Sequence, residues 1–231
     1  MEITTRRYLA ARGVWELRLA DGTRLWVLPE AAVALQGTLE AGQLELLREE
    51  SVYLQARDYA VRALGRRELF TRELADRLRA RQVPPAIAAR LLAELQEKGY
   101  LDDERAARGF VRARLARYLT GPRKLTAELR RHGIAREAAR RVVEECTPPG
   151  YEEKALAKFV QRCGETCRRR LKEELGQALA DASRTESRGG PAAVEFRVRA
   201  KHLARIRARL VNAGFSGEAA ARAGRRILFG E

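Results

Sequence analysis

The cysteines and histidines of this chain are candidate metal ligands, because both residue types commonly bind zinc. Cys163 and Cys167 lie four residues apart, Cys146 stands alone, and the histidines are His132 and His202. The cysteine spacing differs from a C-x2-C knuckle, and neither histidine belongs to an H-x3–5-H set. We therefore predict no metal site and interpret the cysteines as ordinary thiols, whose odd number favours a reducing compartment.

An acidic pair and a glycine–proline step are the next candidates. Asp102 and Asp103 could suggest a metal pair, but a carboxylate before a helix that begins near Glu104 is better explained as an N-cap. Gly121-Pro122 could suggest a phosphate loop, but it is better explained as a break followed by a proline at a first helical position. The chain has no G-x4-GK[ST] motif, no paired catalytic carboxylates and no nucleophile–histidine set. We predict no catalytic residue, no cofactor and no enzyme.

Arginine dominates the charge of the chain. Its 231 residues include 46 lysines and arginines, of which only six are lysine, and the formal net charge is +15. Residues 1–50 carry a net charge of −2, residues 105–141 carry +10, and residues 197–209 hold six cations and no acid. Arginine binds phosphate and carboxylate through paired hydrogen bonds. A clustered basic field of this kind predicts a polyanionic partner.

The elements that position these residues begin with a small β-rich extension. Residues 15–19 and 23–28 alternate in polarity around Asp21-Gly22, which is the favoured signal of a type I′ hairpin with positive φ at both turn residues. Residues 2–9 could add a third strand. Because two strands alone are marginally stable in water, we expect this extension to pack on another element.

The rest of the chain has the apolar periodicity of helices. Gly65 ends the first helix, and Thr71 is expected to be the N-cap of a helix over residues 71–81. Pro84-Pro85 opens the next helix and Gly99 closes it. No segment approaches the roughly 18 apolar residues of a membrane span, and the N-terminus lacks the apolar core of a secretory signal. We therefore predict a cytoplasmic protein without a membrane partner.

A unit of three apolar residues, with spacings of four and five, occurs three times. The copies are Leu74, Leu78 and Val83; Leu125, Leu129 and Ile134; and Ile206, Leu210 and Phe215. Ten residues before each copy lie Leu64, Leu115 and Phe196, and further small or apolar positions follow each copy. The third copy is thirty residues later than the first spacing predicts, and residues 163–193 look like a short extra helix followed by a polar, disordered loop around residues 183–191. Stacked helical repeats predict an elongated body.

With these repeats in place, the chain resembles the RecX family of bacterial recombination regulators over residues 55–229. The matching residues are Gly99, Leu101-Asp102-Asp103, Ala106, Phe110, Val111, Gly121, Leu125, Glu128-Leu129, Gly133-Ile134 and Gly214-Phe215. Two features depart from the family pattern: Arg81-Gln82 replaces the usual basic–glycine pair, and the loop before the third copy is long.

The resemblance implies a mainly α fold of three tandem three-helix repeats in an elongated curved array, here with a small N-terminal β hairpin. We expect an extension over residues 1–42, repeats over 43–103, 104–147 and 148–231, and an insert over 163–193. Family members bind the RecA–single-stranded DNA filament in its groove and inhibit its ATPase, strand-exchange and coprotease activities. The resemblance therefore places the chain in DNA repair, homologous recombination and the SOS response, with RecA, single-stranded DNA and also double-stranded DNA as partners of a monomer.

Cations of the repeats are the predicted contacts with the filament and with nucleic acid. They are Arg66, Arg67, Arg105, Arg112, Arg117, Arg123, Lys124, Arg205, Arg207 and Arg209. Free amide hydrogens at the helix that Arg123 and Lys124 open are expected to strengthen the positive field there. Trp15, Trp26 and Phe110 could stack on bases, but their apolar periodicity favours core positions. The alternative function is a stand-alone DNA-binding protein whose repeats act like helix-turn-helix units.

Overall fold

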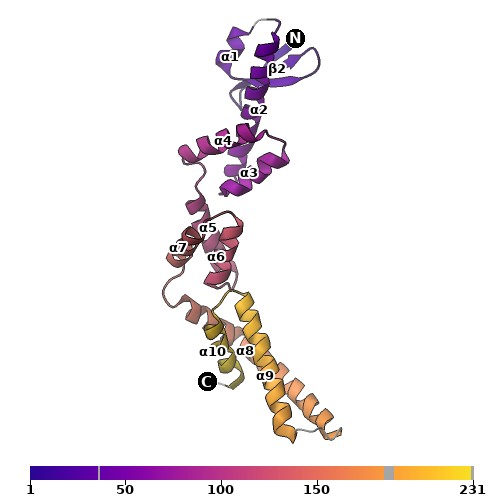
Figure 1. The fold of residues 1–231 in the computed structure, drawn as a ribbon, viewed down its shortest axis with the longest axis vertical. Coiled ribbons are helices and arrows are strands. Elements are labelled where there is room, and N and C mark those ends of the chain that lie inside the picture. The colour runs from indigo at the N-terminus through magenta and orange to yellow at the C-terminus, as the bar shows by residue number, and fades with distance from the viewer. Residues whose placement is uncertain (36, 185–189, 230–231) are drawn as a thin grey trace. The chain divides into compact units, whose positions relative to one another are not determined.

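The computed structural model describes residues 1–35, 37–184 and 190–229. It divides into two compact units, Met1–Ala106 and Ala107–Glu231. Ten helices and one three-stranded sheet make up the regular structure of the described residues (Figure 1). The prediction of a mainly α protein with a small N-terminal β element is confirmed.

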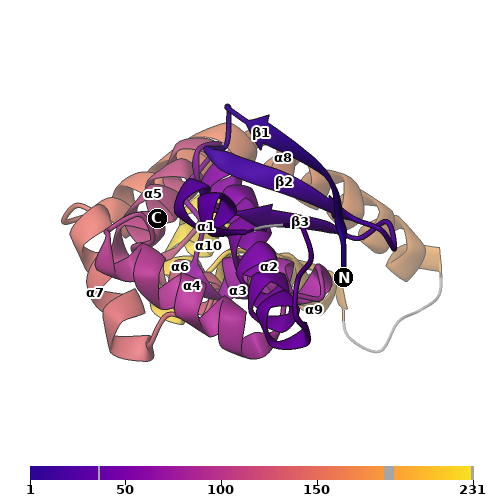
Figure 2. The same cartoon turned by 90° about the horizontal axis from the view of Figure 1, so that it is seen from above.

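The first unit begins with an antiparallel sheet of β1 (Ile3–Leu9), β2 (Val14–Leu19) and β3 (Arg24–Val27), in that order (Figure 2). The turn between β2 and β3 is not the predicted type I′ turn. Gly22 has a φ of +84°, whereas Gln82 is the only non-glycine residue with positive φ in the described chain, so Asp21 lacks it. The Gly22 N–H donates to the Leu19 carbonyl at 2.9 Å, and the Thr23 N–H donates to Asp21 Oδ1 at 2.9 Å. This is a three-residue loop in which the side chain of Asp21 holds the turn and only the glycine needs positive φ.

The sheet packs on a helix, as expected for so small a β element. Pro29 opens a helix that the sequence did not predict, α1 (Pro29–Ala34), and α2 (Ala41–Leu64) follows. The inward residues of β2 and β3 form one buried cluster with residues of α1, α2 and the segment between them: Leu17, Leu19, Leu25, Val27, Ala32, Leu39 and Leu47. The Trp26 N–H donates at 2.8 Å to the hydroxyl of Ser51, a buried residue of α2. Without this hydrogen bond, the backbone N–H of Trp26 would be left without an acceptor between the sheet and α2.

The first three-helix repeat consists of α2, α3 (Thr71–Ala80) and α4 (Pro85–Glu97). The helices predicted here are confirmed, and Leu74, Leu78 and Leu91 are fully buried between them. The expected N-cap is wrong, because Phe70 holds that position and Thr71 is already helical. The Thr71 N–H instead donates to Asp103 Oδ1 at 2.7 Å. A carboxylate 32 residues along the chain therefore supplies the acceptor that a local cap would provide.

The second repeat consists of α5 (Asp103–Arg117), α6 (Pro122–Arg131) and α7 (Arg136–Cys146). Asp102 Oδ1 accepts the N–H groups of Glu104 and Arg105 at 2.9 and 3.0 Å. The expectation that one of the paired carboxylates caps this helix is confirmed. Pro122 is the first residue of α6, directly after Gly121, again as expected.

The third repeat consists of α8 (Tyr151–Arg184), α9 (Gly190–Asn212) and α10 (Gly217–Phe229), packed around a core that includes Phe159, Leu210, Phe215 and Ile227. Residues 163–184 continue α8 and form no separate helix, so the inserted residues lengthen α8. The predicted polar loop around residues 183–191 is wrong at both ends, because residues 183–184 belong to α8 and residues 190–191 to α9, and residues 185–189 lie outside the described residues.

The apolar triplets correspond to one helix ending that is repeated three times. In each copy the third residue donates its N–H to the carbonyl of the second: Val83 to Leu78, Ile134 to Leu129 and Phe215 to Leu210, each at 3.2 Å. The residue before the third has positive φ: Gln82 at 59°, Gly133 at 96° and Gly214 at 94°. This is the Schellman motif, in which an apolar contact accompanies the reversed backbone. The first copy therefore has the same geometry as the other two although glutamine replaces glycine.

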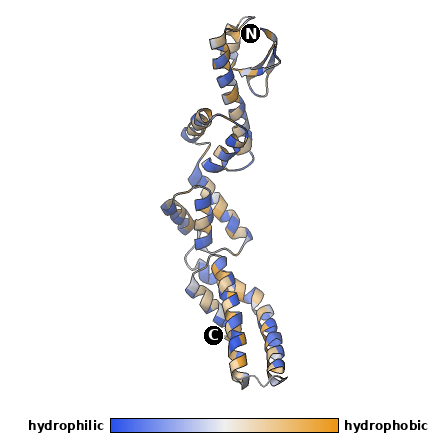
Figure 3. Ribbon diagram, turned by 45° about the vertical axis from the view of Figure 1, so that its right-hand side comes forward, coloured by the Kyte–Doolittle hydropathy of each residue, from blue (hydrophilic) through white to orange (hydrophobic). Residues whose placement is uncertain are grey.

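One predicted apolar position does not lie in the core. Phe196 of α9 is 74% exposed, whereas its counterparts Leu64 and Leu115 are half-buried. Figure 3 shows hydrophilic and hydrophobic residues mixed along the long helices α8 and α9. Within the described residues no helix combines the length and apolar character needed to cross a membrane.

Candidate nucleic-acid interface

The ten predicted cations fall into three settings. Carboxylates hold Arg67, Arg105 and Arg205. Arg66 lines a cavity of the first unit, which Arg67 also lines, and Arg117 and Arg209 line a cavity of the second unit. The remaining four, Arg112, Arg123, Lys124 and Arg207, have exposed side chains.

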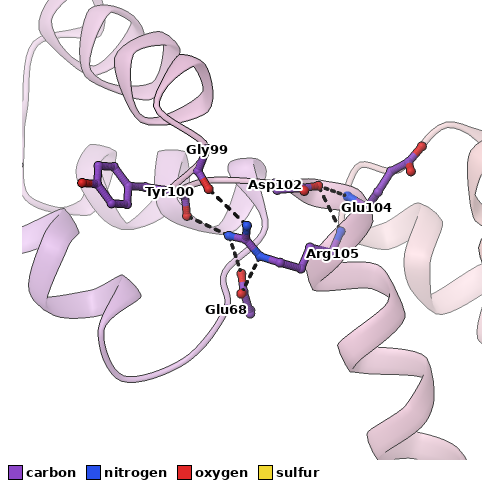
Figure 4. A network of polar contacts seen from close by, with 6 residues as sticks. All are labelled: Glu68, Gly99, Tyr100, Asp102, Glu104 and Arg105. Carbon is purple, nitrogen blue, oxygen red and sulfur yellow. Dashed lines mark hydrogen bonds and ion pairs between the residues drawn. The ribbon is translucent and has the colours of Figure 1, made fainter.

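Arg105 is occupied within the first unit (Figure 4). Its Nε donates to Glu68 Oε1 at 2.7 Å and its Nη2 to Glu68 Oε2 at 3.3 Å. The same guanidinium donates to the carbonyls of Gly99 and Tyr100, at 3.1 and 3.3 Å. The hydrogen bond to Glu68 raises the pKa of Arg105. Because these bonds use most of its five donors, Arg105 ties the end of α4 to the start of α5 and leaves little for a ligand.

The start of α6 differs from the expectation. The Gly121 N–H donates to the Ala213 carbonyl at 2.7 Å, and the Arg123 N–H donates to the Gly214 carbonyl at 3.2 Å. The carbonyls that end α9 thus take amide hydrogens that were expected to face a phosphate. The side chains of Arg123 and Lys124 are still exposed, but they act as charges without a free helix N-terminus.

Two glycines make this junction between α6 and α9. A Cβ on Gly121 would lie 2.2 Å from the carbonyl carbon of Gly214, which is far inside van der Waals contact. A Cβ on Gly214 would lie 2.4 Å from Lys124 Cβ. Only glycine at both positions allows the two backbones to come this close.

Arg117 and Arg209 lie in one cavity of about 800 Å³ between the end of α5, the first turns of α8 and the end of α9. We call it the α5–α8–α9 groove. Its other cations are Lys154, Lys158 and Arg162, which the sequence analysis missed. Their spacing of four residues places them along one face of α8, about 6 Å apart along the helix axis. That spacing is visible in the sequence, but the sequence does not show that this face of α8 lies beside the ends of α5 and α9.

The α5–α8–α9 groove also contains three aromatic rings and, among the described residues, no acidic lining residue. Tyr118 is 56% exposed, and the Arg209 guanidinium lies 5.4 Å from the centre of the Phe159 ring. The Tyr151 hydroxyl donates to the Thr120 carbonyl at 3.0 Å, and burial raises the pKa of this phenol. A groove of cations and rings without a carboxylate suits a nucleic-acid strand, whose phosphates need positive charge and whose bases stack on aromatic faces.

A second cavity, of about 970 Å³, lies in the first unit. We call it the arginine basin after the side chains that line it: Arg12, Arg62, Arg66, Arg67, Arg77 and Arg81. The sequence analysis selected only two of the six. The others come from the β1–β2 turn, from α2, from α3 and from the turn after α3, and only tertiary packing brings these segments together.

The sequence of this chain is similar to those of known proteins. The family model described as RecX, second three-helix domain, matches residues 102–143. Regulatory protein RecX of Halorhodospira halophila is 33% identical over 153 residues, which cover 58% of this chain and 91% of that protein. The chain belongs to the RecX family of regulatory proteins.

Other RecX proteins agree with this assignment. Regulatory protein RecX of Chromohalobacter salexigens is 40% identical over 120 residues, covering 51% of this chain and 78% of that protein. The Thermus thermophilus protein of the same name is 43% identical over 103 residues, covering 45% and 68%. A crystal structure of a regulatory protein RecX has a TM-score of 0.59 at 17% identity and covers 94% of this chain and 96% of that chain. At this identity the structural likeness concerns the fold alone, and it extends the RecX fold beyond the second repeat.

Proposed function

We propose that this chain is a regulator that binds the RecA–single-stranded DNA filament and inhibits its ATPase, strand-exchange and coprotease activities without catalysis of its own. The names of its RecX relatives, which are regulatory proteins, support the regulatory part. The observation that carries the proposal is the α5–α8–α9 groove, where five cations meet three aromatic rings. We also propose that the protein acts as a monomer in the cytoplasm.

The groove would hold the DNA strand of the filament. The row of Lys154, Lys158 and Arg162 would follow the phosphates, since successive cations on one helix face form a continuous positive track. Tyr118 would offer its exposed ring to a base. Neither contact reads sequence, which fits a regulator that must act on any stretch of filament.

Inhibition would follow from binding one state of the filament in preference to others. A ligand shifts a conformational equilibrium only by its difference in affinity for the states. A chain that contacts the strand and neighbouring recombinase subunits together would favour one arrangement of those subunits. The exposed cations Arg112, Arg123 and Arg207 would supply contacts outside the groove. ATP hydrolysis and strand exchange, which require the subunits to move, would then slow down.

The test combines a filament assay with a groove variant. Wild-type protein is expected to inhibit the ATPase of RecA on single-stranded DNA. The triple variant Lys154→Ala, Lys158→Ala and Arg162→Ala should inhibit at higher concentrations only. In direct binding to oligo-dT, the slope of log affinity against log salt should fall by about two, since each lost contact with a single strand contributes about 0.7.

The matched control is the triple variant Arg169→Ala, Arg170→Ala and Lys172→Ala, which removes three exposed cations of α8 outside the groove. It should inhibit like wild type. An unchanged ATPase with wild-type protein would refute the regulator proposal, and DNA binding without that effect would favour the stand-alone DNA-binding function. Equal losses in the two triple variants would show that net charge matters and the groove does not.

A further inference from the structure

The arginine basin is built from parts of the first unit that lie far apart in the sequence. The β1–β2 turn supplies Arg12, α2 supplies Arg62, and the connection to α3 supplies Arg66 and Arg67. Arg77 belongs to α3, and Arg81 begins the Schellman turn after it. The N-terminal sheet is therefore one wall of the cavity and more than an appendage to the repeats.

Two half-buried carboxylates brace four of the six arginines. Asp58 lies 3.5 Å from Arg12 Nε and also pairs with Arg62, while Glu73 pairs with Arg67 and, at 2.7 Å, with Arg77. The carboxylate side chains are only 19% and 24% exposed, whereas the arginines expose between 36% and 60%. The acids thus lie below the guanidinium groups and orient them toward solvent.

The neighbouring arginines lower the pKa of the Glu73 carboxyl. Burial alone would raise the pKa of this carboxyl, but hydrogen bonds from Arg67 and Arg77 hold the pKa below its ordinary value. Six arginines against these two carboxylates give a formal net charge of +4 around the cavity. A concave surface with uncompensated charge of one sign concentrates ions of the other sign.

Arg66 and Arg81 have no carboxylate partner among the described residues. Arg81 instead lies over the Tyr59 ring, 3.8 Å from its centre, and its hydrogen bond lowers the pKa of that phenol. Arg12 covers Trp26 in the same way at 4.8 Å. Both rings are half-buried, which leaves each with little free surface. The guanidinium above each ring covers a face on which a base would otherwise stack. The basin offers forked N–H donors and little stacking surface.

We propose that the arginine basin binds the phosphates of double-helical DNA. Arginine forks match phosphate oxygens and hold a backbone without reading its bases. A single-strand site adds stacking platforms to its charges, and here the rings are covered, so the paired and stacked bases of a duplex fit the basin better. In the α5–α8–α9 groove the Arg114 guanidinium lies farther from the centre of the Tyr118 ring, at 5.5 Å, and that ring is 56% exposed, whereas Tyr59 and Trp26 are half-buried. The two units of the chain would then hold different forms of DNA, and the N-terminal sheet would be part of the duplex site.

The experiment uses the full chain with Arg66→Ala and Arg81→Ala combined, because removing these two arginines leaves no carboxylate without its partner. The matched control combines Arg24→Ala and Arg72→Ala, which removes two exposed arginines of the same unit outside the basin. Fluorescence anisotropy measures binding to a labelled 20-base-pair duplex and to oligo-dT across a salt series. For the duplex, the slope of log affinity against log salt should fall by about two in the basin variant, since each lost contact contributes about 0.9. The control slope and the oligo-dT affinities should stay at wild-type values.

Three results would overturn the inference. The first is a wild-type protein that does not bind the duplex, and the second is a basin variant with the wild-type slope. The third is an equal loss on oligo-dT, which would make the basin a general single-strand site. A poly-glutamate peptide is a further arm: if wild type binds it more tightly than the duplex and the basin variant loses it, the basin recognises an acidic protein partner instead. None of these readouts involves a recombinase, so their failure is distinct from failure of the proposed function.

Discussion

Gln82 holds a backbone conformation that its side chain disfavours, and replacing it with glycine should stabilise the first unit. Its φ of 59° lies where Gly133 and Gly214 stand in the other two repeats. A left-handed conformation costs an L-residue roughly 1–2 kcal/mol. Glycine would remove this strain but would add about 0.4–1 kcal/mol of entropy loss on folding. The side chain is exposed, so little packing is lost, and Gln82→Gly should gain about 0.5–1 kcal/mol.

Hydrogen exchange of the α3 amides is the appropriate assay, because a chain of two units need not unfold as a single two-state system. The slowest amides of α3 should exchange about two- to fivefold more slowly in Gln82→Gly, provided that they exchange through opening of the whole unit. Gly214→Ala is the opposite perturbation, since it adds a left-handed alanine and a Cβ 2.4 Å from Lys124 Cβ. It should destabilise the second unit and leave α3 unchanged. Faster exchange of α3 in Gln82→Gly would refute the strain argument.

Two further predictions concern packing and pH. Gly121→Ala should destabilise the second unit by about 1–3 kcal/mol or more, because its Cβ meets backbone atoms of Gly214 that cannot rotate away. Urea denaturation followed by circular dichroism would measure this loss of stability. A midpoint equal to that of wild type would contradict the prediction. Glu73 has a lowered pKa in the folded chain, so its contribution to stability is complete above the ordinary value of 4.5 and is lost as the pH falls through the folded value. Glu73→Gln should therefore lose less stability than wild type in thermal melts as the pH falls below about 4.5. Parallel pH profiles would show that the ion pairs with Arg67 and Arg77 do not stabilise the fold.

The sequence was informative wherever the structure depends on neighbours along the chain. The triplets predicted buried faces because leucines four residues apart share one side of a helix. Asp102 and Pro122 predicted helix starts because capping is a matter of the first turn. Phe196 shows the limit of the repeat, because a position can match in sequence and still be exposed to solvent in the structure.

The candidate sites could be predicted only in part, because a cation is defined by the groups opposite it. Arg105 and Arg112 look alike in the sequence, yet Glu68, 37 residues earlier, occupies the first of them. Thr71 looked like a cap, but the acceptor at that helix start comes from Asp103. The arginine basin and the α5–α8–α9 groove each need three or more segments to meet. No periodicity within one segment encodes such a meeting.

The junction of Gly121 with Ala213 and Gly214 bears on how the protein is made. The acceptors for the start of α6 lie more than ninety residues further along the chain. During synthesis α6 leaves the ribosome well before α9, and its first amide groups must remain hydrated until the end of α9 arrives. The second repeat is therefore completed only after most of the third has been translated. A nascent chain that stops before Ala213 would carry an unfinished α6, and quality-control proteases could distinguish it from the full-length product by that exposed helix end.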